Sequence, residues 1–276
     1  MRKIVTYIII LAIVSACSDH KKSNKQTIET STSEQNLENK ISDRIAYVMD
    51  PKLTDSLCKS DISRAKSDIK NGKLVYVQTA GLGFGFKRYE TDLKKLCKEN
   101  GLEYDVDLIG CVVMEGQTQG CYGAYMDKIL IDKFGADFKE KLNQQADSLF
   151  LARVIKEEIP IFSWDCDEEP KPILGNKKYL ETTLDVPNLD LKRTELAKTW
   201  PAIDLSFIIE RNGKISKFYS NNYISNLKHN EKYKNQLYNI AIDYIKNNYP
   251  NWKAGEINGT PVRTDHNLRI TFIGKT

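Results

Sequence analysis

The C-terminal part of the chain carries a strand, turn, strand, helix and strand pattern that constrains its fold more than any other feature. Apolar residues alternate along the first of these strands, so one of its faces is expected to be buried: Ile203, Leu205, Phe207 and Ile209. Asn212-Gly213 then gives a strong hairpin-turn signal, and the sequence KISKFYSN returns as the second strand. The two strands are therefore predicted to form an antiparallel pair.

A helix and a final strand complete this pattern. Apolar residues recur at helical spacing before Tyr249-Pro250, where the helix is expected to end: Tyr233, Leu237, Ile240, Ala241, Tyr244 and Ile245. Trp252 and an Asn258-Gly259 turn follow, and the last strand places its apolar residues on one face: Leu268, Ile270 and Phe272. Residues 200–276 are thus predicted to form a β-β-α-β domain, and the whole chain belongs to the α+β class.

This C-terminal region resembles a known domain. The shared features are the Asn-Gly hairpin, the single helix, and four short runs: Trp252-Lys253-Ala254, Asn258-Gly259, Pro261-Val262-Arg263 and the closing LRITF strand. Together they resemble the C-terminal domain of TonB over about 75 residues. The resemblance implies a periplasmic domain that binds outer-membrane receptors by capturing an extended receptor segment as an added strand. An edge strand suits that use, because it offers a row of unpaired N–H and C=O groups.

The resemblance also indicates where the partner is expected to bind. The contacts would lie on the last strand and just before it: Arg263, Leu268, Arg269, Ile270 and Thr271. Trp252 is expected to be a packing residue. TonB itself has an inner-membrane helix and a long proline-rich stretch, so the expectation extends to partner binding and not to energy transduction.

Residues 46–150 are predicted to form a small α/β domain. Asp50-Pro51 is expected to begin a helix that Asn71-Gly72 ends. The runs KLVYVQTA and LEYDVDLIGCVV are rich in β-branched and aromatic residues and are predicted to be strands, with a helix between them. This order predicts a βα crossover at the centre of the domain.

About 65 residues of this region resemble the FEKKY domain, a small bacterial family of unknown function. The features that match are Phe86-Lys87-Arg88-Tyr89 at the start of a helix, the strand end Gly110-Cys111-Val112-Val113, and the helical stretch from Tyr125 to Phe138. The motif that names the family is altered here, since no acidic residue follows Phe86. The resemblance implies no activity.

The GLGFGF run between a predicted strand and a predicted helix suggests a nucleotide loop, but its spacing does not fit. Gly81, Gly83 and Gly85 are spaced G-x-G-x-G, whereas the dinucleotide motif is G-x-G-x-x-G, and the sequence has no GK[ST] for a phosphate-binding loop. We therefore expect no cofactor here and interpret the glycines as a tight loop that needs positive φ angles.

Residues 151–199 are predicted to be a solvated linker. The stretch EEIPIFSWDCDEEPKPILG contains three of the chain's eight prolines and an acidic cluster: Asp165, Asp167, Glu168 and Glu169. Carboxylates can bind Ca²⁺, but the spacing matches no EF-hand, so no metal is expected. A nucleophilic Cys166 would need a nearby histidine, and the chain has only His20, His229 and His266. We expect no catalytic residue.

Five cysteines follow Cys17: Cys58, Cys97, Cys111, Cys121 and Cys166. Because their number is odd, at least one has no disulfide partner within the chain. Cys111 and Cys121 flank a loop with two glycines, and a disulfide between them is the pairing that the sequence suggests. The alternative is that they are buried free thiols.

The amino end has the layout of a bacterial secretory signal. A basic start precedes an apolar run of roughly 12 residues, shorter than the about 20 that a membrane span needs. Ser15-Ala16 before Cys17 resembles a lipobox, which implies that residues 1–16 are removed and that Cys17 carries lipid. Residues 17–45 are polar and are predicted to be a flexible tether. The expected location is the periplasmic side of the cell envelope. The residue after Cys17 is Ser18, not the aspartate that retains some lipoproteins at the inner membrane. The outer membrane is therefore favoured over the inner membrane.

Charge excludes one class of partner. The chain has 41 basic and 37 acidic residues, and removal of residues 1–16 would take away Arg2 and Lys3. The remainder is nearly balanced, so no strong field points to nucleic acid.

Two functions remain open from the sequence. The first is a lipid-anchored, non-enzymatic envelope protein whose TonB-like domain binds a protein partner by strand addition. The alternative is an envelope enzyme or small-ligand binder centred on the Gly81–Gly85 loop and the Cys111–Cys121 loop, with Glu115 or Gln117 as its polar group.

Overall fold

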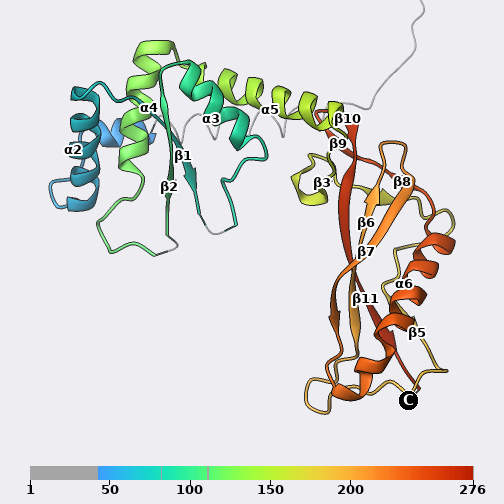
Figure 1. Ribbon diagram of the computed structural model, residues 1–276. Helices are drawn as coiled ribbons and strands as arrows, with labels where there is room; N and C mark the ends of the chain where they lie inside the picture. The colour runs from blue at the N-terminus through green and yellow to red at the C-terminus, as the bar shows by residue number, and fades with distance from the viewer. Residues whose placement is uncertain (1–42, 82, 111, 276) are drawn as a thin grey trace, which may run out of the picture. The chain divides into compact units, whose positions relative to one another are not determined.

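The computed structural model describes residues 43–81, 83–110 and 112–275, and its fold is mixed α+β, as the sequence predicts (Figure 1). The predicted signal peptide, most of the tether, Cys17 and Cys111 lie outside the described residues. The chain divides into two compact units. The first contains the described residues up to 81 together with 106–133, and the second contains 83–105 together with 134–275.

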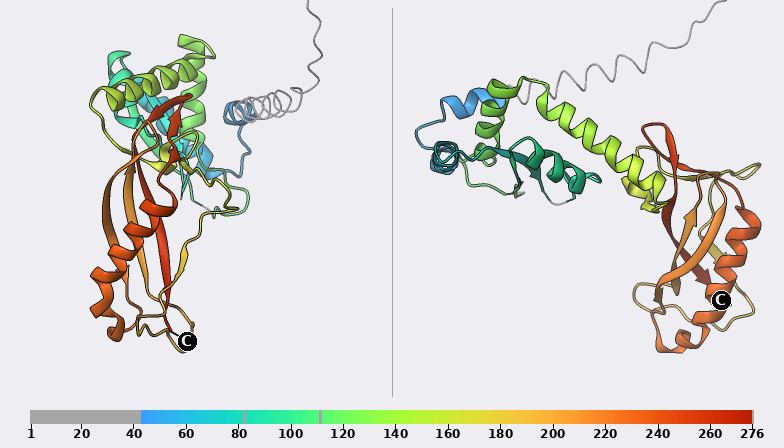
Figure 2. Two further views of the ribbon diagram at one scale, coloured as in Figure 1. Left: turned by 90° about the vertical axis from the view of Figure 1, so that its right-hand side faces the viewer. Right: turned by 45° about the horizontal axis from the view of Figure 1, so that its top comes forward.

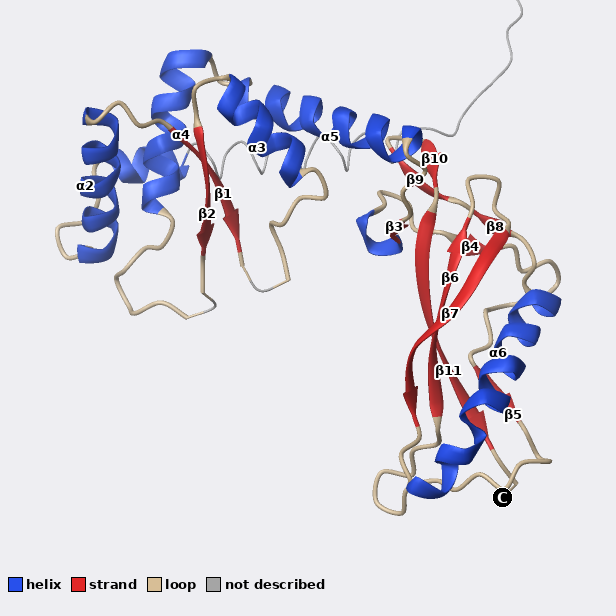
Figure 3. Cartoon of the chain, viewed as in Figure 1, coloured by secondary structure: helices blue, strands red, loops and turns tan. Residues whose placement is uncertain are grey.

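The first unit is built from helices and one strand pair. Residues 43–49 are helical, so the end of the predicted tether already belongs to the folded part. Helix α2 (Ser56–Lys70), strand β1 (Val75–Ala80) and helix α4 (Cys121–Phe134) follow. Strand β2 (Glu103–Leu108), whose second half belongs to this unit, pairs with β1, and the two arrows run in the same direction, as expected for a βα crossover (Figure 3).

Helix α2 begins later than Asp50-Pro51 predicts. Its N-cap is Asp55, whose side chain accepts a hydrogen bond from the Cys58 N–H at 3.0 Å. The buried face therefore starts at Cys58 and continues through Ile62 and Ala65, while Leu53 is 88% exposed. The helix ends at Asn71, as predicted.

The second unit begins with two helices that pack on each other. Helix α3 (Glu90–Glu99) buries Leu93, Leu96 and Cys97, and helix α5 (Phe138–Lys156) buries Leu142, Ala146 and Phe150. Arg153 of α5 donates to the Asp92 carboxylate of α3 at 2.9 Å.

The main sheet of the second unit has the predicted β-β-α-β order. Strands β6 (Ala202–Ile209) and β7 (Ile215–Ile224) are followed by the 3₁₀ helix η2 (Lys228–Tyr233), helix α6 (Lys234–Asn248) and strand β11 (Thr264–Ile273). Strands β8 (Trp252–Lys253), β9 (Gly255–Ile257) and β10 (Thr260–Val262) lie between α6 and β11. β6 pairs antiparallel with both β7 and β11, so it lies between them.

Helix α6 lies lengthwise along the long strands and buries one face of the sheet (Figure 2). The residues that alternate in sequence make this core: Ile203, Leu205, Phe207, Ile209, Ile270 and Phe272, all fully buried. Leu237, Ala241 and Ile245 of α6 complete it. Trp252 is 3% exposed and contacts the Phe207 ring edge-on at 5.3 Å, which confirms its packing role.

The segment predicted to be a solvated linker is part of the folded domain. Strand β3 (Ile161–Phe162), the 3₁₀ helix η1 (Ser163–Asp165), strand β4 (Lys171–Pro172) and strand β5 (Thr183–Asp185) all fall within it. β3 and β5 pair in parallel with the two ends of β11, and four residues join the core: Leu184, Val186, Leu189 and Leu191. Strands of two or three residues show no hydrophobic period, which is why the sequence did not reveal them.

Candidate protein-binding surface

The main sheet presents one long edge in its described part, along β7. The strand order is β3-β11-β6-β7, and among the described strands β7 pairs only with β6. Pro201, which immediately precedes β6, accepts the Phe272 N–H of β11 at 3.0 Å. Backbone groups alternate in direction along a strand, so the odd-numbered residues of β6 also direct their N–H and C=O groups to β11. In an antiparallel pair these directions alternate, so Phe218, which lies opposite Phe207, directs its own N–H and C=O away from the sheet.

Two β-bulges limit the regular part of this edge. The register of β6 with β7 shifts between Asp204 and Leu205 and again between Ile208 and Ile209, and each shift places one extra residue in β7. Between the bulges the register is continuous, over residues 217–220. Bulges are common on edge strands and twist them away from indiscriminate pairing. The regular stretch is therefore the part of the edge best suited to accept another strand.

The strand that the sequence predicts as the binding edge, β11, lies inside the sheet. β6 pairs along one side of it, while β3 covers its start and β5 covers its end on the other side. Thr271 donates its N–H to the Thr182 carbonyl at 2.8 Å, Ile270 is fully buried, and Leu268 packs against the core. The structure thus corrects the predicted edge: the chain's own segments already occupy the ends of this strand.

The two predicted arginines form ion pairs within the domain. Arg263 donates to both oxygens of Glu210 at 2.7 and 3.0 Å, and Arg269 donates to both oxygens of Asp204 at the same two distances. Hydrogen bonds from Arg263 and Arg269 hold the pKa values of these two carboxyl groups below their usual range. Both guanidinium groups therefore already have a carboxylate partner within the domain.

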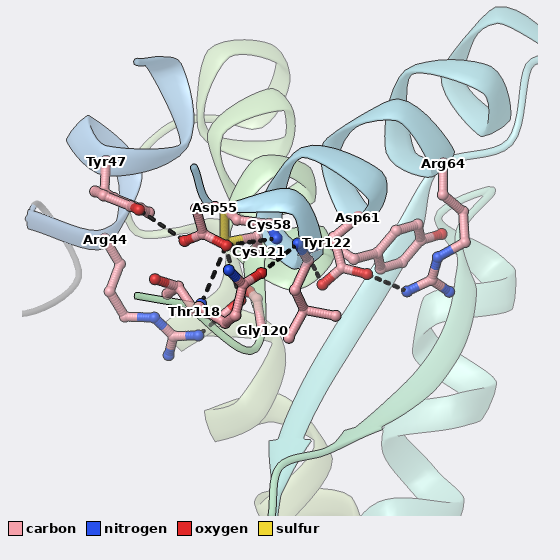
Figure 4. The surroundings of a disulfide bond; sticks show 12 residues. Arg44, Tyr47, Asp55, Cys58, Asp61, Arg64, Thr118, Gly120, Cys121 and Tyr122 are labelled. Carbon is pink, nitrogen blue, oxygen red and sulfur yellow. Dashed lines mark hydrogen bonds and ion pairs between the residues drawn. A yellow bond between two sulfur atoms is a disulfide. The ribbon is translucent and has the colours of Figure 1, made fainter. Parts of the chain in front are cut away.

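The disulfide in the first unit differs from the predicted one. Cys121 is bonded to Cys58, 63 residues earlier, and both side chains are buried (Figure 4). The predicted Cys111–Cys121 bridge is therefore excluded. Cys58 lies near the start of α2 and Cys121 at the start of α4, so the bond joins the first turns of these two helices. Sequence spacing gave no signal for a pair so far apart.

Asp55 organises the chain around this disulfide. Its carboxylate accepts hydrogen bonds from the Cys58 N–H at 3.0 Å, the Thr118 N–H at 3.2 Å and the Tyr47 hydroxyl at 2.7 Å (Figure 4). Burial alone would raise the pKa of Asp55, but these hydrogen bonds outweigh it and lower the pKa to about 2. The buried carboxylate is therefore ionised and fully engaged in positioning the helix start and the loop before α4.

A hollow of about 240 Å³ lies beside the disulfide, within the first unit. It is lined by residues of the helix at 43–49 and of the loop that leads into α4: Asp43, Arg44, Tyr47, Val48, Thr118, Gln119, Gly120, Cys121 and Ala124. Arg44 donates to the Gly120 carbonyl at 3.3 Å across it. Only the end of the predicted Cys111–Cys121 loop contributes to this hollow.

The other residues of the predicted small-ligand site have structural contacts or are exposed. Gln117 accepts from the Leu57 N–H at 2.9 Å and donates to the Thr54 carbonyl at 3.1 Å, which fixes the turn before α2. Glu115 is exposed. Gly83 and Gly85 have φ angles of 79° and 86°, as the tight-loop interpretation requires.

In the second unit, Arg88 of the Phe86–Tyr89 run forms an ion-pair cluster. It donates to both oxygens of Asp147 at 2.7 and 2.9 Å and to Asp167 at 2.6 Å. Asn258, in the β9–β10 turn, donates to the same two carboxylates. Burial would lower the pKa of Arg88, but the two aspartates raise it above its usual value. The cluster thus joins three distant parts of the chain.

An open hollow of about 460 Å³ borders this cluster, with two exposed aromatic residues, Phe86 and Trp164, among its lining. Asp165 and Asp167 of the acidic cluster, for which the sequence predicted no metal, line this hollow. Asp167 pairs with Arg88, and Glu168 pairs with Lys171 at 3.6 Å. Within the described residues, no group of three or more His, Cys, Asp or Glu side chains is arranged to hold a metal ion.

Cys166 also lines this hollow, but it is not an activated nucleophile. Burial raises the pKa of its thiol to about 12, so the reactive thiolate is scarce at neutral pH. His266 packs on Phe207 and Trp252 at 5.4 and 5.1 Å between ring centroids.

None of the helices in the described ranges is both long and apolar enough to cross a membrane. No protein-family model, curated protein or solved structure matches this chain.

Proposed function

We propose that this chain is a non-enzymatic, protein-binding module of a bacterial cell envelope, and that it captures an extended segment of its partner as an added strand along β7. The observation that carries the proposal is that β7 forms a long edge of the sheet with no described strand on its outer side. At the other edge of the sheet, β3 and β5 cover the two ends of β11. The resemblance of the C-terminal region to the TonB C-terminal domain supports the same mode of binding.

The position of the binding edge follows from the sheet order. An added strand needs a neighbour with outward-facing N–H and C=O groups, and Phe218 supplies both at the centre of the regular stretch. β11 offers only a short interval between the residues that pair with β3 and β5, namely 266–270. Both ends of this interval are closed by the chain's own segments, whereas no described strand lies along the outer side of β7, so β7 is the more accessible edge for an extended segment.

The membrane attachment belongs to the same proposal. Cys17 would carry lipid, and the polar residues 17–42 would connect it to the helix at 43–49. Such an anchor holds a protein at the surface of a membrane that it does not span. The periplasmic face of the outer membrane is the proposed location. Mass spectrometry of the purified protein tests this, since lipidation adds acyl chains to Cys17 and a Cys17→Ser variant would lose them.

In-cell photo-crosslinking tests the binding edge. Single photo-reactive residues placed at Lys217 and Tyr219 should crosslink to one envelope protein, through a single extended segment of it. The matched control sites are exposed positions of α6, Asn235 and Asn247, which lie on the same domain but not on the strand. Equal crosslinking from α6 and β7, or crosslinks only within the chain, would refute strand capture at this edge.

A further inference from the structure

The chain segment that forms the binding edge carries only basic charges, while the Tyr219 hydroxyl donates to the Asp265 carboxylate of β11. The segment from Arg211 to Ile224, which forms the hairpin turn and β7, has three basic residues and no acidic one: Arg211, Lys214 and Lys217. Arg211 is paired with Glu158 at 3.4 Å. Lys214 donates to the neutral amide oxygen of Asn251 at 2.5 Å, so its charge is not compensated by that contact.

Two lysines flank the regular stretch of β7 from opposite faces of the sheet. Lys246 of α6 lies over the Phe218 ring at 5.3 Å, on the face that the helix covers. Lys217 lies on the other face, with its ammonium 5.7 Å from the Tyr219 ring. In the described structure neither ammonium has a carboxylate within ion-pair distance, and each is held only by an aromatic ring.

We infer that the segment added at β7 is acidic. This inference rests on the proposed function. Side chains of an added strand alternate between the two faces of the sheet, so an Asp or Glu on one face approaches Lys246 and an Asp or Glu on the other approaches Lys217. Phe218 and Tyr219 beside the lysines also suit the apolar parts of such a segment.

The same charges disfavour a second copy of this chain as the occupant. Two β7 strands paired edge to edge would bring Lys217 and Lys246 of one copy close to those of the other, and like charges across a strand pair are destabilising. The lysines thus disfavour self-association and attract a segment of opposite charge. The occupant is therefore a different protein with an acidic extended segment.

Three synthetic ten-residue peptides test this inference. Each alternates Thr and Val and carries Glu, Gln or Lys at the same three positions. Binding to the purified full chain is measured by fluorescence anisotropy at low and high salt, and the bound site is located by hydrogen exchange on β7. We expect the Glu peptide to bind most tightly, to slow exchange in β7, and to weaken as salt rises.

Charge variants separate the edge from the rest of the surface. Lys217→Gln/Lys246→Gln should weaken binding of the Glu peptide about fivefold, the effect expected for two exposed ion pairs. Lys178→Gln/Lys198→Gln removes the same charge from two exposed loop positions and should leave the affinity unchanged. The Gln peptide should be insensitive to both pairs of substitutions.

The outcomes distinguish the two levels of the proposal. Equal binding of the Glu and Gln peptides, both with protection of β7, would overturn the acidic preference and leave strand capture intact. Failure of all three peptides to protect β7 would overturn strand capture and, with it, this inference. Binding of the Glu peptide with protection elsewhere than β7 would also overturn the inference.

Discussion

Reduction of the Cys58–Cys121 disulfide should destabilise the first unit selectively. The bond joins the first turns of α2 and α4 across a sequence separation of 63 residues. In the unfolded chain it closes a loop of that length, so its main effect is to restrict the unfolded ensemble.

The size of the effect follows from the loop length. With a separation of 63 residues, the chain-entropy relation gives a stabilisation of about 4 kcal/mol. Such a change corresponds to a roughly thousandfold change in the opening equilibrium of the unit.

Hydrogen exchange with mass spectrometry measures the change unit by unit. Amides of α2 should exchange about a thousandfold faster after reduction, whereas amides of α6, in the second unit, should be unaffected. A Cys58→Ala/Cys121→Ala variant should reproduce the effect. Cys97→Ala removes another buried sulfur from a cysteine that forms no disulfide and serves as the matched control.

Two results would refute this reasoning. The first is an acceleration of less than about tenfold in α2 after complete reduction, which would mean that the loop is already restricted without the bond. The second is a disulfide map that joins Cys121 to Cys111 rather than to Cys58.

Three further changes test other parts of the structure. Gly213→Ala should lower the free energy of unfolding, measured by urea titration, by more than the about 1 kcal/mol that is typical of a glycine substitution. Gly213 has a φ of 76°, and an added β-carbon would collide with the Trp252 carbonyl oxygen. Gly259→Ala is the matched control and should lower the free energy of unfolding less, because Gly259 has a φ of 70° but open space around it. Asp55→Asn should destabilise the first unit by about 1–3 kcal/mol, measured by exchange in α2, because an amide satisfies its three donors less well than the ionised carboxylate does; no change would mean that the charge is unimportant. Burial lowers the pKa of His266, and Glu169 and Asp265 oppose this shift. The unfolded state therefore binds more protons, so the free energy of unfolding should fall as the pH drops below about 6.5. His266→Phe should flatten this pH dependence in denaturation followed by Trp fluorescence, and identical slopes for the two proteins would contradict the assignment.

The sequence predicted the parts of the fold that have a clear period. Alternation from Ile203 to Ile209 identified the face of β6 that packs on α6, and helical spacing from Leu237 to Ile245 identified the buried face of α6. The other face of β6 is largely buried as well, since Ala202, Ser206 and Ile208 are at most 5% exposed. Asn212-Gly213 identified the hairpin, and Gly213 adopts a positive φ of 76° in its turn.

The parts that failed depend on contacts between distant segments. β5 spans only Thr183–Asp185 and gains its stability from β11, so its own sequence carries no pattern. Because β5 pairs with the end of β11, that strand is not a free edge, and the candidate binding site lies on β7 instead. The sequence also could not predict the disulfide partner of Cys121, because Cys58 lies next to it only through the packing of α2 on α4.

Strand capture requires that an extended partner segment pairs with the backbone of β7. The most direct test is residue-level hydrogen exchange along β7 in the full chain, with and without the partner segment recovered by crosslinking. If a partner strand is added, the Phe218 N–H, which faces outward, becomes strongly protected, while the Tyr219 N–H, which already faces β6, changes little. Protection of α6 amides with no change at Phe218 would contradict it.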